Sequence, residues 1–178
     1  MAVSSRPRDN VATGWYCPKA VIPTYFLKME IELLADHSES IPMLADWYVS
    51  EWEPYYGVNG PGDARADLES RRKRDEIPIG FVATEDGEVY GTGALDLDAA
   101  TGLTPSIVGL LVGPLQRGRG IATALLESAE SLAKRLGYSR LYVSTTVLGG
   151  LLVRMGWYSL GEVEFVNEEH GSIYARDL

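Results

Sequence analysis

The chain has 178 residues, of which 46% are hydrophobic, and this length and composition suit one domain with a core of its own. The 25 acidic and 16 basic residues give a net charge of −9, which argues against sequence-independent nucleic-acid binding, since that needs a basic face. Neither an apolar run of 18 residues nor a signal peptide is apparent, so no membrane association is expected.

The first 28 residues differ from the rest of the chain. They hold three prolines and show little periodicity, so we expect an irregular N-terminal extension (1–28) before a single domain (29–178). The one cysteine, Cys17, lies in the extension and rules out an intrachain disulfide. A cytoplasmic location is the economical expectation.

Hydrophobic periodicity predicts the elements of the first half of the domain. Residues 29–34 read as a strand, and apolar residues between 40 and 52 recur at three- and four-residue steps, as on one helix face. Residues 64–74 form a second, more polar helical candidate. The β-rich segments 79–84 and 89–97 flank Glu85-Asp-Gly-Glu88, which is typical of a hairpin turn.

The second half contains the most informative segment. A nearly all-apolar run, 107–112, predicts a central strand buried on both faces. A turn with Gly118 and Gly120 follows, and then an amphipathic helix, 121–136, that is terminated by Gly137. Further predicted elements are a strand at 141–146, a short helix at 149–155, and closing antiparallel strands at 163–166 and 172–175.

The glycine turn has the properties of a phosphate site. Glycine lets the backbone approach a bulky ligand, and the helix N-terminus directs unsatisfied N–H groups and a positive dipole toward it. Arg117 and Arg119 add charge. A nucleotide-triphosphate P-loop is excluded by the lack of Gly-Lys-Ser/Thr. A dinucleotide site is disfavoured because a third glycine and the downstream acid are missing.

The segment Arg117-Gly-Arg-Gly-Ile-Ala122 resembles the R/Q-x-x-G-x-G/A acetyl-CoA signature of the GCN5-related N-acetyltransferase (GNAT) superfamily. The resemblance extends from about Glu30 to the C-terminus. It is strongest from Gly109 to Trp157, where Arg154-Met-Gly-Trp157 contributes. It implies an α/β fold in which helices flank a mixed, mostly antiparallel central sheet.

The resemblance also implies acetyl-CoA as co-substrate. The pyrophosphate would lie on the amides of the glycine turn, and the thioester and pantetheine along the end of the central strand. The residues so implicated are Leu110, Leu111, Val112, Arg117, Gly118, Arg119, Gly120, Ile121 and Ala122. No metal is expected, because His37 and His170 lack ligand spacing.

The acceptor site and the general base are harder to predict. Glu51 and Glu53 stand among aromatic residues, an arrangement that suits a cation by charge and by ring faces. The alternative is that the aromatic residues are core and the acids are solvated. The aromatic residues are Trp47, Tyr48, Trp52, Tyr55 and Tyr56.

One departure from the resembled family concerns the general acid. Many members carry a tyrosine, which protonates the departing thiolate, where this chain has Leu152. Tyr142 and Tyr158 are nearby in sequence and are candidate substitutes, as are Thr145 and Thr146.

The sequence therefore predicts an acetyl-CoA-dependent N-acetyltransferase of a small, cationic amine, working by direct transfer in a ternary complex. The alternatives are a non-catalytic acyl-CoA-binding or regulatory domain, an O-acyltransferase and a protein N-terminal acetyltransferase. We expect neither a nucleic-acid nor a membrane partner, and a homodimer is left open.

Overall fold

One seven-stranded sheet forms the centre of the computed structural model, which describes residues 29–165 and 168–178. The strand order is β1-β2-β3-β4-β5-β7-β6, and every neighbouring pair is antiparallel except β4 and β5. The strands are β1 (Glu30–Leu33), β2 (Ile79–Glu85), β3 (Glu88–Asp96), β4 (Ser106–Val112), β5 (Arg140–Thr145), β6 (Tyr158–Glu164) and β7 (His170–Asp177). The expected mixed, mostly antiparallel α/β fold is confirmed.

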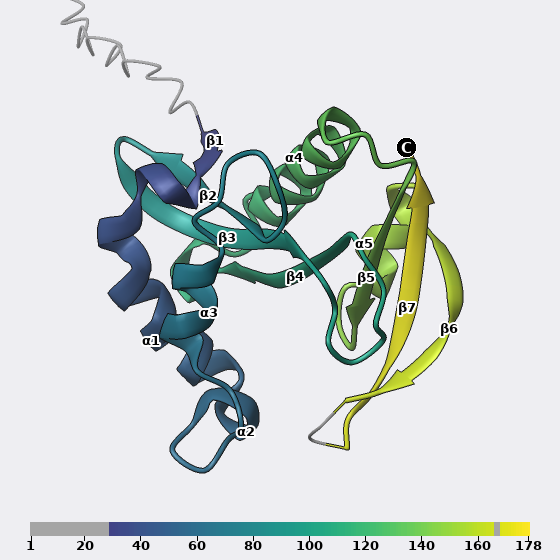
Figure 1. The fold of residues 1–178 in the computed structure, drawn as a ribbon, viewed down its shortest axis with the longest axis horizontal. Coiled ribbons are helices and arrows are strands. Elements are labelled where there is room, and N and C mark those ends of the chain that lie inside the picture. Colours follow the sequence, from purple (N-terminus) through teal and green to yellow (C-terminus); the bar gives the residue numbers. More distant parts are fainter. Residues whose placement is uncertain (1–28, 166–167) are drawn as a thin grey trace, which may run out of the picture.

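Helices cover both faces of the sheet (Figure 1). The α-helices are α1 (Ile41–Glu51), α2 (Glu53–Tyr56), α3 (Ala64–Ser70), α4 (Ile121–Arg135) and α5 (Gly149–Arg154), and short 3₁₀ turns are η1 (Leu34–Asp36), η2 (Ser38–Ser40) and η3 (Pro114–Gln116). Leu125 and Ala129 of α4 pack with Phe81 in the larger core cluster. Tyr48 of α1 and Val82 of β2 belong to a second cluster on the opposite face. The two clusters make one domain with a core on each side of the sheet.

The strands β4 and β5 separate soon after they meet. They pair at two positions, Ser106 with Tyr142 and Ile107 with Val143, while β4 stays paired with β3 as far as Val112. Beyond Ile107, the edge of β4 that faces β5 has no strand partner within the described chain. Unpaired backbone groups in such a gap are available to bind a ligand.

A β-bulge marks the point of separation. The β3–β4 register shifts between Thr92 and Ala94, opposite Gly109, whose φ is +58°. The Tyr48 hydroxyl donates to the Gly109 carbonyl at 2.8 Å, and a Cβ on Gly109 would overlap that hydroxyl. Glycine is therefore required for two independent reasons, the positive φ and the close approach of Tyr48.

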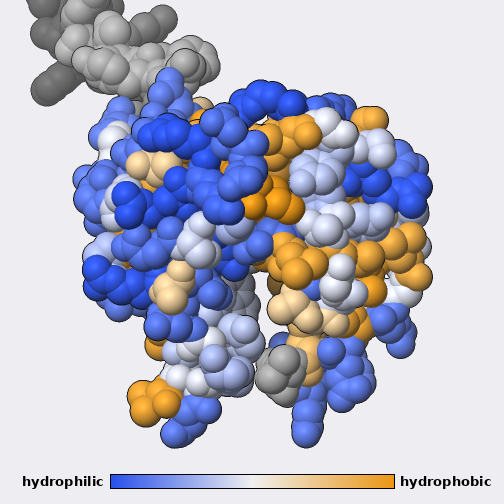
Figure 2. Space-filling view, viewed as in Figure 1, coloured by the Kyte–Doolittle hydropathy of each residue, from blue (hydrophilic) through white to orange (hydrophobic). Residues whose placement is uncertain are grey.

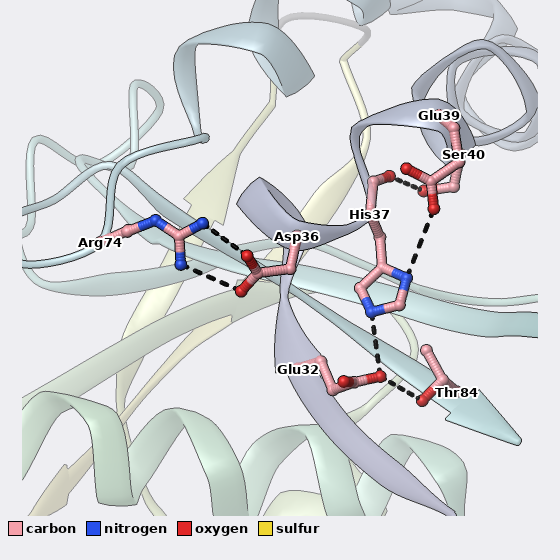
Figure 3. A network of polar contacts seen from close by, with 7 residues as sticks. All are labelled: Glu32, Asp36, His37, Glu39, Ser40, Arg74 and Thr84. Carbon is pink, nitrogen blue, oxygen red and sulfur yellow. Dashed lines mark hydrogen bonds and ion pairs between the residues drawn. The ribbon is translucent and has the colours of Figure 1, made fainter. Parts of the chain in front are cut away.

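A polar network attaches β1 to the chain that leads into α1 (Figure 3). Glu32 of β1 accepts a hydrogen bond from Thr84 at 2.8 Å, and its carboxylate lies 2.9 Å from His37. Asp36 forms a two-pronged ion pair with Arg74, whose guanidinium lowers the pKa of that carboxyl group. These contacts position the turns η1 and η2, through which the chain passes from the sheet edge into α1.

Several predicted boundaries need correction. The helix expected over 64–74 ends at Ser70, because the chain turns there and Arg72 bridges to Ile79. The strand β4 is half-buried from Val108 to Leu110, where β5 diverges, so the expectation of burial on both faces is wrong there. The predicted extension (1–28), with Cys17, lies outside the described residues.

Candidate active site

The glycine turn is open at the positions where the sequence predicts a ligand. Gly118 and Gly120 have φ values of +78° and +80°, and nothing lies within 4 Å of a Cβ built on either residue. Helix α4 begins at Ile121. Its first amides have no intrahelical acceptor, and no side chain of the N-cap residue takes that place. The turn thus presents backbone donors and a positive helix end to an anion.

Both arginines of the turn are held by carboxylates. Arg117 donates from Nη2 to Glu51 Oε2 at 2.7 Å, and from Nε to the Val112 carbonyl at 3.2 Å. Arg119 donates to Glu85, a buried carboxylate, at 2.6 Å, and its guanidinium lies 5.2 Å from the Tyr90 ring centroid. The structure therefore joins Glu51, a predicted acceptor residue, to Arg117, a predicted cofactor residue.

The end of β4 lies beside this turn. Leu111 is buried against α1, whereas Leu110 and Val112 are half-buried and pack toward the α4 side of the sheet. A small cavity of about 100 Å³ lies where α1 meets the turn, and its lining includes Trp47, Leu111 and Arg117. The open edge of β4 therefore leads directly to the glycine turn.

Of the five predicted aromatic residues, Tyr48 is buried and the other four are half-buried. The side chain of Tyr48 is fully buried, and its ring lies 4.9 Å from Trp52 between centroids. Tyr56 donates to Asp67 at 2.7 Å, and burial together with Asp67 raises its pKa, so it stays protonated. Core packing therefore accounts for Tyr48, while the interpretation as ring faces for a cation stays a prediction for the half-buried Trp47, Trp52, Tyr55 and Tyr56.

The two predicted acids of the acceptor region differ in their contacts. Glu51 is paired with Arg117, whereas Glu53 is exposed at the start of α2. Beside α2, Figure 2 shows a hollow between the surface over α2 and the surface over β6 and β7. The structure thus places Glu53 on an element that borders the hollow, and Glu51 between that element and the glycine turn.

Tyr142 and Tyr158 lie away from the gap between β4 and β5. Tyr158 is on β6, and its hydroxyl donates to Asp177, which also pairs with Arg140 at 2.6 Å. Tyr142 lies on the same face of the sheet as Tyr158 and also faces Asp177, because both tyrosines pair with Ala175 of β7. Arg140 begins β5, whereas the gap opens beyond Val143, so neither hydroxyl is placed to protonate a group bound there.

Comparison with known proteins agrees with this geometry. The model of the acetyltransferase (GNAT) family matches residues 41–160, which is more than half of the chain. The chain belongs to the GNAT acetyltransferase family. No curated protein sequence matches it significantly.

Solved structures show the same fold. An aminoglycoside 6'-N-acetyltransferase complexed with coenzyme A is 15% identical with a TM-score of 0.66, and the match covers 83% of this chain and 96% of that one. A GNAT acetyltransferase from Streptococcus pneumoniae is 16% identical with a TM-score of 0.61, over 85% and 99% of the two chains. N-acetylglutamate synthase from Neisseria gonorrhoeae, complexed with coenzyme A and N-acetyl-glutamate, is 22% identical with a TM-score of 0.61. The match covers 85% of this chain but 35% of that one.

In this GNAT acetyltransferase, Leu152, which takes the place of the family's usual tyrosine, is buried in the core. Leu152 lies on α5, is fully buried, and packs in the larger core cluster. Trp157, at the end of the Arg154-Met-Gly-Trp motif, donates from Nε1 to Glu130 of α4 at 3.1 Å. Arg176 pairs with the same carboxylate at 3.0 Å. This part of the motif thus connects α4 to β7.

One polar pair beside the gap is not predictable from the sequence alone. Ser144 of β5 donates from Oγ to Asp98 Oδ2 at 2.5 Å, and Asp98 is 7% exposed. Asp98 follows β3, and 46 residues separate the two partners. Nothing local in the sequence distinguishes this aspartate from other loop acids, so only the sheet topology could have revealed the pair.

Proposed function

We propose that this acetyltransferase transfers the acetyl group of acetyl-CoA directly to a small, cationic amine within a ternary complex. The observation that carries the proposal is the open glycine turn at the N-terminus of α4, which lies at the end of the unpaired edge of β4. A phosphorylated, elongated thioester fits both features: an anion site and a strand edge able to bind an extended arm.

The proposed roles follow from the chemistry of amide formation. The amides from Gly118 to Ala122 hold the pyrophosphate, with Arg117 and Arg119 beside them. The edge of β4 positions the thioester, and one of its free amides stabilises the oxyanion of the tetrahedral intermediate. The amine attacks the carbonyl carbon, the C–S bond breaks, and CoA leaves as a thiolate. No acyl-enzyme is formed.

Charge favours a cationic acceptor. The chain carries a net charge of −9, and Glu53 lies on α2 beside the hollow, with Glu51 close by on α1. A cation is drawn to such a region, and the attraction weakens with salt because exposed charges are screened beyond about 8 Å at physiological ionic strength.

A second function has one observation in its favour. Leu152 fills the position of the usual general acid, as it would in a GNAT domain that binds acyl-CoA without catalysis. A thiol has a pKa near about 8.5 and is a tolerable leaving group, so loss of this acid does not forbid turnover.

Steady-state assays with a panel of amines distinguish the N-acetyltransferase from the non-catalytic acyl-CoA-binding domain. Thiol release from acetyl-CoA that depends on an amine, with an acceptor KM that rises with salt, supports the enzyme and the cationic acceptor. Tight acetyl-CoA binding without thiol release for any amine would instead support the binding domain. Preference for an anionic acceptor, or for the α-amino group of a peptide, would reject the small cationic amine.

A further inference from the structure

We propose that Ser144 and Asp98 form the proton-accepting pair of the active site, with the Ser144 hydroxyl touching the acceptor nitrogen and Asp98 behind it. This inference rests on the proposed function, because it needs an amine acceptor. It assigns the general base, which the sequence left open between acids elsewhere in the chain.

Ser144 lies on β5 at the mouth of the gap between β4 and β5. Val143 is the last β5 residue paired with β4, so Ser144 is the first residue beyond the point where the strands separate. Val143 packs in the core cluster that contains α4. Because neighbouring strand residues face opposite sides of a sheet, Ser144 faces the α1 side, and it is half-buried there.

Hydrogen bonds hold the Asp98 side chain and the loop that carries it. Its Oδ2 accepts from Ser144 at 2.5 Å and its Oδ1 accepts from the Ala100 amide at 2.9 Å. Its own amide donates to the Leu103 carbonyl at 3.0 Å, which closes the loop between β3 and β4. The buried carboxylate therefore reaches across this loop to a hydroxyl at the mouth of the gap.

Within the described residues, no cation neutralises this carboxylate. The nearby acid of β3, Asp96, is paired with Arg71, and the ion pairs of β5 and β7 involve Arg140 and Arg176, whose partners are other acids. The groups in contact with Asp98 are a hydroxyl and an amide, both neutral. Within the described residues, therefore, no ion-pair partner competes with an incoming cationic acceptor for the Asp98 oxygens.

The proton balance is simple. An ammonium acceptor must lose one proton before it attacks, and the Ser144 hydroxyl takes this proton while passing its own to Asp98. The neutral nitrogen then forms the C–N bond as the C–S bond breaks, and CoA leaves as a thiolate. The second nitrogen proton neutralises the thiolate, and Asp98 returns its proton to water.

Asp98→Asn gives the sharpest test. The amide oxygen still accepts from Ala100, so the loop keeps its turn, but the side chain no longer takes up a proton. For a primary alkylamine at neutral pH, kcat/KM should fall by about 10²-fold or more, the scale of general-base catalysis. The affinity for acetyl-CoA, measured by calorimetry, should stay unchanged.

The pH profile separates proton transfer from a structural role. The difference between Asp98→Asn and the parent should narrow as the pH approaches the amine's own pKa, because more of the acceptor then arrives neutral. For an alkoxyamine, whose nitrogen is already neutral at pH 7, Asp98→Asn should lower kcat/KM much less. Ser144→Ala should reproduce the loss, and Ser144→Thr, which restores a hydroxyl, should recover most of the activity.

Three outcomes would overturn the pair. The first is an unchanged kcat/KM in Asp98→Asn. The second is a kcat/KM that falls by the same factor at every pH and for both the alkylamine and the alkoxyamine. A loss accompanied by weaker acetyl-CoA binding would show that Asp98 only holds the loop. If the parent itself turns over no amine while binding acetyl-CoA, the proposed function fails, and the pair fails with it.

Discussion

Glu51 and Arg117 form an ion pair with 2.7 Å between Oε2 and Nη2, and this pair connects α1 to the glycine turn. Both side chains are about half exposed, so the pair contributes little to stability. An incoming pyrophosphate would compete with Glu51 for the same guanidinium. Binding of acetyl-CoA would then release Glu51 toward the acceptor side, which links the two substrates through one exposed contact.

The first prediction concerns this competition. Glu51→Gln removes the rival carboxylate, so the affinity for acetyl-CoA should rise by up to about fivefold, which matches the roughly 0.2–1 kcal/mol of an exposed ion pair. Calorimetry measures the change. Glu53→Gln is the matched control, because it alters the net charge equally without a contact to Arg117. Equal effects of the two variants would show that net charge alone is responsible.

The second prediction concerns Gly120. A valine there is strained by the positive φ and would project into the open space above the turn, so the affinity for acetyl-CoA should fall tenfold or more, about 1.4 kcal/mol. Gly137→Val is the control, since Gly137 has a φ of +87° in equally open surroundings at the other end of α4. Both variants should lower the melting temperature, but only Gly120→Val should weaken binding.

The third prediction concerns the bulge. Tyr48→Phe leaves the Gly109 carbonyl without its buried donor, which should cost about 1–3 kcal/mol in unfolding free energy. Because the bulge positions the unpaired edge of β4, kcat should fall more than the acetyl-CoA affinity. Chemical denaturation and steady-state kinetics provide the two measurements. A loss of stability with unchanged kcat would limit Tyr48 to a structural role.

The fourth prediction concerns the missing acid. Leu152 is fully buried, so Leu152→Tyr should overpack the core and cost about 1–3 kcal/mol without raising kcat. Leu152→Phe supplies the ring without the hydroxyl and should behave alike. A higher kcat for the tyrosine variant, but not for the phenylalanine variant, would show that the site has room for an acid and has simply lost it.

Local sequence predicted what depends on local physics. The hairpin turn before Glu88, the helix that begins at Ile121 and its stop at Gly137 all follow from residue type and spacing, and the structure has them. The resemblance to the GNAT family rests mainly on the segment from Gly109 to Trp157, which includes the strand, the glycine turn, the helix and Arg154-Met-Gly-Trp157. The strand expected at 163–166, which is β6 at Tyr158–Glu164, and the end of α3 at Ser70 were predicted less accurately, because tertiary contacts set them.

The contacts of the candidate site were beyond such reasoning. The partners in Glu51–Arg117 are 66 residues apart, those in Tyr48–Gly109 are 61 apart, and those in Asp98–Ser144 are 46 apart. Each pair forms because the sheet order brings distant segments together. A single sequence carries the chemistry of each residue but not the register that selects its partner.

Amine-dependent release of free CoA thiol is the decisive measurement for acetyl transfer by this protein. With acetyl-CoA and a cationic primary amine, we expect thiol release that saturates with both substrates, weakens with salt and drops strongly in Gly120→Val. A parent protein that binds acetyl-CoA in calorimetry but releases no thiol with any amine of a broad panel would contradict acetyl transfer to an amine and indicate an acyl-CoA-binding domain.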